Sequence, residues 1–290
     1  MKRIPAVIAA LLFATTLLAA PTAEQLYRAG RDALQRGQLD KAVEQFEKAV
    51  AAKPNDANYH FWLGNAYGSA TMKANMVNQA GLARKTLASF EKAVQLDPNH
   101  IEARFGLIDY YLRAPGFMGG SEPKAMQQAA EIKKREALAG HRAYARIYMR
   151  QKKTELARKE LVDAVKEQPS SAKAHYFLGN FLVNEKNFAG AIREYETAIK
   201  LDPGYMAAWF RLGQSIAQTG QNFARGEEAL KKYLNHQPTW DEPQHVGAWY
   251  WLGQLYEKQG KKQAAKSAYI NAQRLAPGEK DIEAALKRVS

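Results

Sequence analysis

A segment of 34 residues repeats along most of this chain. One copy, residues 172–205, reads AKAHYFLGNFLVNEKNFAGAIREYETAIKLDPGY, and a second copy of the same design follows at once. The dipeptide Leu178-Gly179 in the first copy becomes Leu212-Gly213 in the next, 34 residues later. A fixed period of this length, with small residues at fixed offsets, is typical of a helix–turn–helix array. The chain is therefore expected to stack a series of helical hairpins.

The first half of the unit is expected to form an amphipathic helix. Its apolar residues recur at helical spacing and are Tyr176, Phe177, Leu178, Phe181 and Leu182. Gly179 interrupts this stripe, and a glycine inside a helix costs about 1 kcal/mol relative to alanine. We therefore expect the second helix to approach closely here, allowed by the small Ala191 and Ala198, with Tyr195 filling the space between them.

Two residues mark the limits of the second helix of the unit. Asn187 is placed to cap its start, and Pro203 prevents it from continuing. A single hairpin of this kind cannot cover its own hydrophobic face, so several must stack to bury a continuous core.

With these features the sequence resembles the tetratricopeptide repeat family, and the match covers nearly the whole chain after residue 22. The resemblance implies an all-α, right-handed superhelical solenoid. We expect about seven repeats over residues 23–279, starting near residues 23, 57, 101, 138, 172, 206 and 246, with turns near Gly37, Gly220 and Gly260. Residues 280–290 place apolar side chains on one face and charges on the other, which predicts a capping helix.

Residues 1–22 have the layout of a secretory signal peptide. Lys2 and Arg3 precede a short apolar run, which ends in small residues before Pro21. Cleavage is expected after Ala19, Ala20 or Ala23. The alternative is an uncleaved membrane anchor, although the run is short for a membrane span. Either way the repeats are expected to be exported, to a bacterial periplasm or, less favoured, to the periplasmic face of the inner membrane.

The charge of the chain is strongly basic, and its cysteine content is zero. The formal net charge is +13, and residues 124–160 carry eleven Lys and Arg against four Glu. A basic balance favours anionic partners, although Lys and Arg that solvate outer helix faces would give the same composition. The lack of cysteine excludes disulfides, thiolate metal sites and cysteine nucleophiles.

The sequence contains no recognisable catalytic motif. There is no phosphate-binding loop, no dinucleotide glycine pattern and no His-Glu-x-x-His, so we expect a protein that is not an enzyme and uses no cofactor. His60, His141 and His175 occupy the same fourth position of their repeats. Equivalent positions in adjacent repeats lie on the order of 10 Å apart, whereas metal–ligand bonds are about 2 Å long. We therefore expect these histidines to pack in place of the family's usual tryptophan, with no metal site.

The resemblance implies that the first helices line a concave groove that holds peptides of partner proteins. Mapped onto this sequence, the groove positions are Tyr27, Arg31, Phe61, Asn65, Phe105, Asp109, Arg142, Arg146, Tyr176, Asn180, Phe210, Gln214, Tyr250 and Gln254. Aromatic side chains at these positions provide contact area, and Asn and Gln can bond to a peptide backbone. The alternative is that the aromatic side chains only pack against the next repeat.

Arg142, Arg146 and Arg150 are spaced four apart and therefore lie on one helix face. Three neighbouring guanidinium groups require either an anionic ligand or acidic side chains of another helix beside them. The predicted partner is an unidentified protein or peptide of acidic character. We do not expect nucleic acid to bind. We expect contact with a membrane only if the N-terminal segment remains uncleaved. The alternative function is a basic module that docks on anionic lipid or polysaccharide of the cell envelope.

Two insertions interrupt the regular pattern, at residues 68–81 and 114–120. Both fall between the first and second helices of consecutive repeats, so stacking should bring them together on one edge of the solenoid. They carry Met72, Met76, Phe117 and Met118, which suit an adaptable contact better than a solvated loop. We expect these side chains to pack together into a lip that contacts the ligand. The alternative is a small cluster that only buries the insertions.

Overall fold

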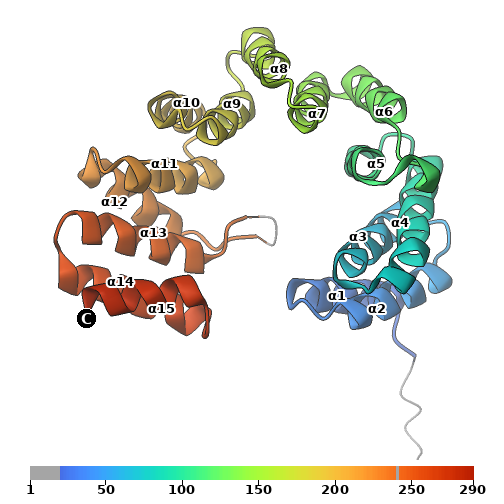
Figure 1. Cartoon of the computed structure of the whole chain (residues 1–290), viewed down its shortest axis with the longest axis horizontal. Helices are drawn as coiled ribbons and strands as arrows, with labels where there is room; N and C mark the ends of the chain where they lie inside the picture. The colour runs from blue at the N-terminus through green and yellow to red at the C-terminus, as the bar shows by residue number, and fades with distance from the viewer. Residues whose placement is uncertain (1–19, 240–241) are drawn as a thin grey trace, which may run out of the picture.

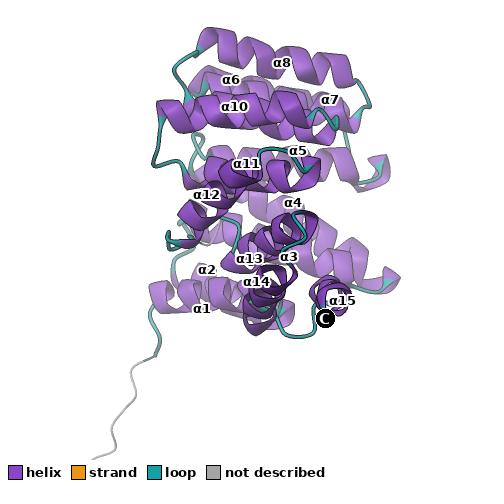
Figure 2. Cartoon of the chain, turned by 90° about the vertical axis from the view of Figure 1, so that its left-hand side faces the viewer, coloured by secondary structure: helices purple, strands orange, loops and turns teal. Residues whose placement is uncertain are grey.

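The computed structural model describes residues 20–239 and 242–290 of the chain. Over these residues it contains fifteen α-helices and one short 3-10 helix, with no β-strand (Figure 2). The helices follow one another along a curved path that almost closes into a ring (Figure 1). The predicted all-α solenoid of seven helix pairs and a final helix is confirmed. The predicted signal segment up to Ala19 lies outside the described residues.

The seven pairs and the final helix have the following bounds: α1 (Ala23–Gln35) and α2 (Leu39–Ala52); α3 (Ala57–Lys73) and α4 (Met76–Leu96); α5 (Ile101–Arg113) and α6 (Glu122–Arg135); α7 (Ala137–Arg150) and α8 (Thr154–Glu167); α9 (Ala172–Asn184) and α10 (Phe188–Leu201); α11 (Met206–Thr219) and α12 (Phe223–Leu234); α13 (His245–Lys258) and α14 (Lys262–Leu275); and α15 (Lys280–Val289). The 3-10 helix η1 (Gly116–Met118) lies between α5 and α6. None of the helices in the described part of the chain is both long and apolar enough to cross a membrane.

The odd-numbered helices line the inner side of the arc, and the even-numbered helices form its outer side (Figure 1). First helices of successive repeats contact one another, as α3 contacts α5 and α5 contacts α7. Second helices of successive repeats make no comparable contacts within the described residues. Because the inner helices lie closer together than the outer ones, the array curves and presents a concave surface made of first helices.

Close packing inside several hairpins explains the spacing between the glycine of the first helix and the aromatic residue of the second helix. A Cβ atom added to Gly179 would lie 2.6 Å from the ring of Tyr195, which is fully buried. In the last repeat, a Cβ on Gly253 would lie 2.4 Å from the ring of Tyr269. The predicted close approach is therefore correct, and the structure adds that the ring of Tyr195, which is buried in one cluster with Ala191 and Ala198, lies directly on the glycine.

The turn residues and the cap agree with the sequence. Gly37, Gly220 and Gly260 have φ angles of 70°, 70° and 71°, the left-handed conformation that favours glycine at a helix end. In α15, Ile282 and Val289 are buried on one face, as the pattern predicts. This face covers the last hairpin and shields its core from solvent.

The fourth residue of several first helices bonds to the loop that precedes it. The Nε2 atom of His60 lies 2.8 Å from the Pro54 carbonyl oxygen, and that of His175 lies 3.1 Å from the equivalent oxygen of Pro169. Trp209 donates from Nε1 to the carbonyl of Pro203 at 3.0 Å. His60, His175 and Trp209 therefore have equivalent roles, and the predicted packing role includes a hydrogen bond to a proline carbonyl.

His141 occupies the same position but has different partners. It is buried, its Nδ1 lies 2.7 Å from a carboxylate oxygen of Glu160, and its Nε2 lies 3.1 Å from Glu167. Arg135 stands where the other repeats have the loop proline, so no equivalent loop contact forms. His60 and His175 thus bond to the closing loop of the preceding repeat, whereas His141 contacts α8 of its own repeat. The described residues contain no group of three or more potential metal ligands.

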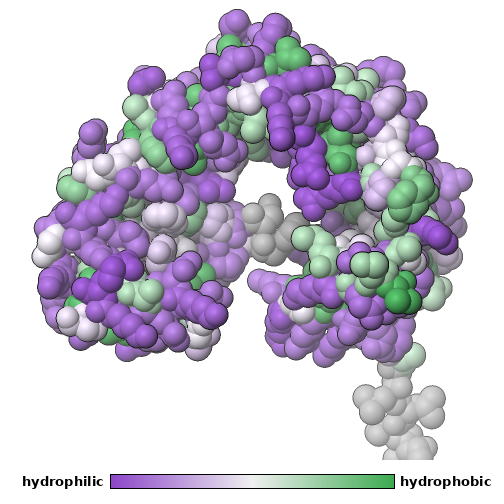
Figure 3. Space-filling view, in the orientation of Figure 1, coloured by the Kyte–Doolittle hydropathy of each residue, from purple (hydrophilic) through white to green (hydrophobic). Residues whose placement is uncertain are grey.

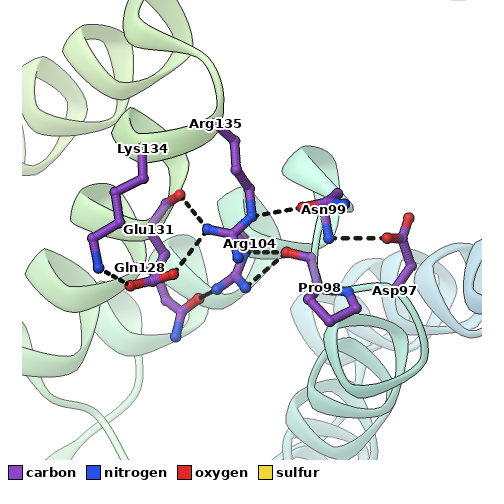
Figure 4. A network of polar contacts seen from close by, with 8 residues as sticks. All are labelled: Asp97, Pro98, Asn99, Arg104, Gln128, Glu131, Lys134 and Arg135. Atoms are coloured by element: carbon purple, nitrogen blue, oxygen red, sulfur yellow. Dashed lines mark hydrogen bonds and ion pairs between the residues drawn. The ribbon is translucent and has the colours of Figure 1, made fainter.

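In the third repeat, Arg104 takes the fourth position and joins three segments (Figure 4). Its side chain is buried and donates to the Pro98 carbonyl from Nε at 3.1 Å and from Nη2 at 2.8 Å. Its Nη1 donates to Gln128 of α6 at 2.6 Å, and nearby Arg135 donates to Asn99 of the same loop at 2.9 Å. This network fixes α5, the central helix of the concave surface, to the loop before it and to α6.

Replacing Arg104 by methionine is expected to lower the free energy of unfolding by about 1–3 kcal/mol, because the Pro98 carbonyl and Gln128 lose a buried donor. Arg104→His should recover part of this loss, since His60 and His175 bond to the equivalent carbonyls. Urea unfolding of both variants tests this. Equal stability of the two variants would show that the loop contact contributes nothing.

Candidate functional site

Six of the predicted groove residues line one pocket on the concave surface. They are Phe61, Asn65, Phe105, Asp109, Arg142 and Arg146. The pocket has a volume of about 420 Å³ and lies between the inner helices α3, α5, α7 and α9. We call it the arginine pocket.

Arg142 is the central side chain of the arginine pocket. Its guanidinium carbon lies 3.9 Å from the ring centroid of Phe177 and 5.2 Å from that of Phe105, so it is stacked between two aromatic rings. Burial lowers the pKa of the Arg142 guanidinium, an effect that Tyr205 and Glu136 oppose. No carboxylate of the described residues lies within ion-pair distance of it. The pocket therefore contains a desolvated cation that still has donors for an anion.

Arg146, one turn further along α7, has an internal partner. Its Nε lies 2.9 Å from a carboxylate oxygen of Asp109 on α5. Burial raises the pKa of Asp109, and the nearby Arg146, Arg113 and Arg150 oppose this rise. The predicted triad is thus divided: Arg146 pairs with an acidic side chain of another helix, whereas Arg142 is available to an external anion. Arg150 is exposed at the end of α7.

At two groove positions the aromatic side chain belongs to the core. Tyr27 is buried and stacks on Tyr59, with ring centroids 5.2 Å apart. Phe210 is buried against Tyr233, also at 5.2 Å. At these two positions the rings pack in the core, as the alternative expected, and the predicted ligand contact stays a prediction.

Most of the predicted polar groove side chains bond within the array. Asn180 accepts a hydrogen bond from Tyr195 at 2.8 Å. Gln254 donates to the hydroxyl of Tyr250 at 3.1 Å. The remaining pairs are Asn65 with the Phe61 carbonyl, Gln214 with Arg211, and Arg31 with the Tyr27 hydroxyl. These hydrogen bonds position the side chains on the inner surface. A bound peptide would have to share these hydrogen bonds or replace them with its own.

Sequence reasoning missed the other residues that line the arginine pocket, among them Lys173, Phe177, Tyr205 and the two carboxylates Glu102 and Glu136. Tyr205 packs edge-on against Tyr176, with ring centroids 5.0 Å apart, and its burial raises the pKa of its hydroxyl. Phe177 directly follows the predicted groove position Tyr176. Successive repeats are offset along the array, so Phe177 lies opposite Arg142 of the preceding repeat. This offset of one residue from the groove position is the sequence feature that would have identified Phe177.

A second pocket, of about 670 Å³, lies where the two insertions meet. It is lined by Met72 and Met76 from the first insertion and by Pro115, Phe117 and Met118 from the second. The two insertions therefore lie side by side. This second pocket, called the insertion pocket below, shares Asn65, Gly106 and Asp109 with the arginine pocket. The two pockets are thus continuous along α3 and α5.

The insertions do not form the packed lip that the sequence predicts. The extra residues of the first insertion lengthen α3 to Lys73 and start α4 at Met76. Met72, Met76 and Phe117 are exposed, and only Met118 packs against the core. The expectation that these side chains pack together is wrong, and so is the alternative of a buried cluster. Their helical and turn backbones direct the apolar side chains outward.

Two kinds of repeat model match the chain. A model described as "Tetratricopeptide repeat" matches residues 142–205 and 182–234, and another of the same description matches 246–279. A model described as "TPR repeat" matches residues 30–69. The chain is built of tetratricopeptide repeats. The matched ranges stop at residue 69 and resume at 142. Nearly all of both insertions lies in the unmatched segment between these residues. The structure still forms the helices of repeats two and three there.

Curated relatives share only part of their length with this repeat array. The general transcriptional corepressor ssn6 of Schizosaccharomyces pombe is 27% identical over 114 residues, which are 39% of this chain and 10% of that protein. Protein bimA of Emericella nidulans is 26% identical over 118 residues, 41% of this chain and 14% of its own. The chain thus spans less than a sixth of either relative, and what these proteins do as a whole does not follow for it.

Solved structures of other repeat proteins share the fold. A human IFIT1 dimer with m7Gppp-AAAA has a TM-score of 0.57 and 18% identity, covering 92% of this chain and 62% of that one. The APC/C heterotetramer Cut9–Hcn1 has a TM-score of 0.54 and 16% identity, covering 92% of this chain and 48% of that one. At these identities the likeness shows the tetratricopeptide repeat solenoid alone.

Proposed function

We propose that this chain is a non-catalytic scaffold of the bacterial cell envelope that binds a segment of a partner protein on its concave surface. Tetratricopeptide repeat proteins generally mediate protein–protein interactions, and their fold is typically a non-catalytic scaffold. The observation that carries the proposal is Arg142, which is stacked between Phe105 and Phe177. Glu102 and Glu136 line the same pocket, but no carboxylate of the described residues forms an ion pair with Arg142.

The arginine pocket suits a carboxylate next to an apolar side chain. A guanidinium group binds carboxylates through two parallel hydrogen bonds, and stacking on aromatic rings fixes its plane before the ligand arrives. Lys173 and Arg146 are further cations of the lining, which also contains the carboxylates Glu102, Asp109 and Glu136. Phe61 and Phe105 offer apolar contact area. A partner segment with Asp or Glu beside an apolar residue fits these features.

The alternative, docking on anionic lipid or polysaccharide, is less favoured by the structure. Five of the eleven basic side chains between residues 124 and 160 already form ion pairs with acidic side chains: Lys134, Arg135, Arg146, Arg158 and Lys159. These pairs reduce the charge available to a polyanionic surface.

A pull-down from envelope extracts, repeated at low and high salt, tests the proposed function. A partner protein bound in an aromatic pocket should remain bound at high salt, because stacking and apolar contacts are not screened. Retention of only lipid or polysaccharide, lost as the salt concentration rises, would favour the alternative and contradict the proposal.

Export of the chain is part of this proposal, and α1 bears on the cleavage site. Thr22 caps α1: its side chain accepts from the backbone N–H of Gln25, and the Gln25 side chain accepts from the N–H of Thr22. Cleavage after Ala19 or Ala20 keeps this cap, whereas cleavage after Ala23 removes it. We therefore expect N-terminal sequencing of the exported chain to begin at Ala20 or Pro21. A start at Glu24 would contradict this.

A further inference from the structure

The four most exposed large hydrophobic side chains of the described chain all lie in the two insertions. Met72 is 75% exposed, Met76 and Val77 are each 87% exposed, and Phe117 is 90% exposed. The next in order, Leu275, is 56% exposed. Hydrophobic residues also reach the surface over the α3–α5 side of the arc in Figure 3. A concentration of exposed apolar side chains on a soluble surface marks an interaction site.

The backbone of the second insertion fixes Phe117 in its exposed position. Met118 donates its N–H to the Pro115 carbonyl at 2.9 Å, and the Tyr110 hydroxyl donates to the Met118 carbonyl at 2.8 Å. Gly120 lies so close to the chain that an added Cβ would be 1.8 Å from the Ala114 carbonyl oxygen. Several contacts therefore fix the backbone of this turn, and this backbone conformation keeps the Phe117 side chain exposed.

The insertion pocket is lined by small and by large residues. The small ones include Gly64, Gly68, Ala80, Ala83 and Gly106. The large apolar ones include Met72 and Met76 of the first insertion and Phe117 and Met118 of the second. Methionine side chains adapt to irregular apolar shapes, and a cavity of this size takes a few bulky side chains rather than a flat surface.

The lining of the insertion pocket carries two charged residues, Arg113 and Asp109. Residues 57–90 and 110–121 contain no Asp or Glu, but they include Lys73, Arg84 and Arg113. No ion pair forms at these three side chains within the described residues. The only acidic residue that lines the pocket is Asp109, which already pairs with Arg146. Because Asp109 forms its ion pair with Arg146, Arg113 is the cation of the pocket lining that remains for an acidic group of a ligand.

We propose that the insertion pocket anchors a partner segment whose bulky apolar side chains are flanked by Asp or Glu. The proposal rests on the proposed function, because the insertion pocket shares Asn65, Gly106 and Asp109 with the arginine pocket. One segment can therefore run from Arg142 to Phe117 along α3 and α5. The insertions then set specificity by adding an apolar anchor to the acidic contact. A bilayer surface fits less well, because a pocket of about 670 Å³ takes individual side chains rather than a flat surface.

A random peptide library displayed on phage tests this proposal with the exported chain as bait. Enriched peptides should combine Phe, Leu, Met or Trp with Asp or Glu. Their affinity should fall at least about tenfold for the combined variant Met72→Gln, Met76→Gln and Phe117→Ser, because buried apolar anchors dominate such interfaces. These side chains are exposed, so the thermal melt should not change. Leu275→Gln, an exposed apolar residue of α14, is the matched control and should bind like the wild type.

Two results would overturn the proposal. In the first, the selected peptides bind the combined variant as tightly as the wild type but lose affinity for Arg142→Gln. This result would support the proposed function and show that the insertion pocket takes no part in it. Vesicles of phosphatidylcholine and phosphatidylglycerol that bind the wild type but not the combined variant, with no enriched peptide, would make the exposed side chains a lipid contact instead.

Discussion

Replacing Gly213 by leucine is expected to lower the free energy of unfolding by about 1–3 kcal/mol, through overpacking between the two helices of the sixth hairpin. A Cβ at this position would lie 2.5 Å from Cγ of Leu230, which is fully buried, and 3.2 Å from the Gly226 carbonyl oxygen. Neither atom can move far, because one is a packed core side chain and the other is helix backbone. Chemical unfolding of the variant measures the loss.

Gly81 supplies the matched control for this prediction. It lies inside α4, is exposed, and an added Cβ would meet nothing within 4 Å. Gly81→Ala should therefore raise stability by up to about 1 kcal/mol, the ordinary helix preference for alanine over glycine. Adding Leu230→Ala to Gly213→Leu should cost less than the sum of the two single changes, because the new leucine fills the vacated space. A Gly213→Leu melt equal to that of the wild type would show that the proposed packing is wrong.

Replacing Arg142 by glutamine is expected to weaken binding of an acidic partner segment by about ten- to a hundredfold, the range of a lost hydrogen bond to a charged group. The stability of the array should stay the same or rise. No described carboxylate loses an ion-pair partner, and a guanidinium group that burial disfavours is removed. Titration of a selected peptide, together with a thermal melt, measures both effects.

Arg146→Gln is the matched comparison, one helical turn away on the same face. It leaves Asp109 without its ion pair, so it should lower stability while affecting binding less than Arg142→Gln. Both side chains of this pair are about a third or more exposed, so the loss should be only about 0.2–1 kcal/mol. If Arg142→Gln destabilised the array and left binding unchanged, Arg142 would be a structural residue and the arginine pocket would lose its proposed role.

The repeat period was sufficient to predict the architecture of the array. A glycine, a small-residue pattern and a closing proline at fixed offsets specify one hairpin, and stacking extends it along the chain. The close approach at Gly179 and the presence of Tyr195 beside it could be predicted, but the direct contact of the ring with the glycine could not. Which side chain lies on a glycine depends on the rotation of the two helices, and periodicity does not specify this rotation.

The site was predicted only in part, because it lies between repeats. Arg142 and Phe105 follow from their positions in single repeats, whereas Phe177 faces Arg142 only after the fourth and fifth repeats stack. Tyr27 and Phe210 have the same repeat position as Phe105, yet they are buried by residues of neighbouring helices. The exposure of Met76 and Phe117 depends on extended helices and a tight turn, which composition alone does not predict.

Site-specific photo-crosslinking tests the central claim most directly. Asn65 lines both pockets, so a photoreactive residue at position 65 should crosslink to the partner protein recovered from envelope extracts. The same residue at Lys200, exposed on α10 of the outer side, should not. Crosslinks from position 200 and none from position 65 would place the partner on the convex surface and contradict the account.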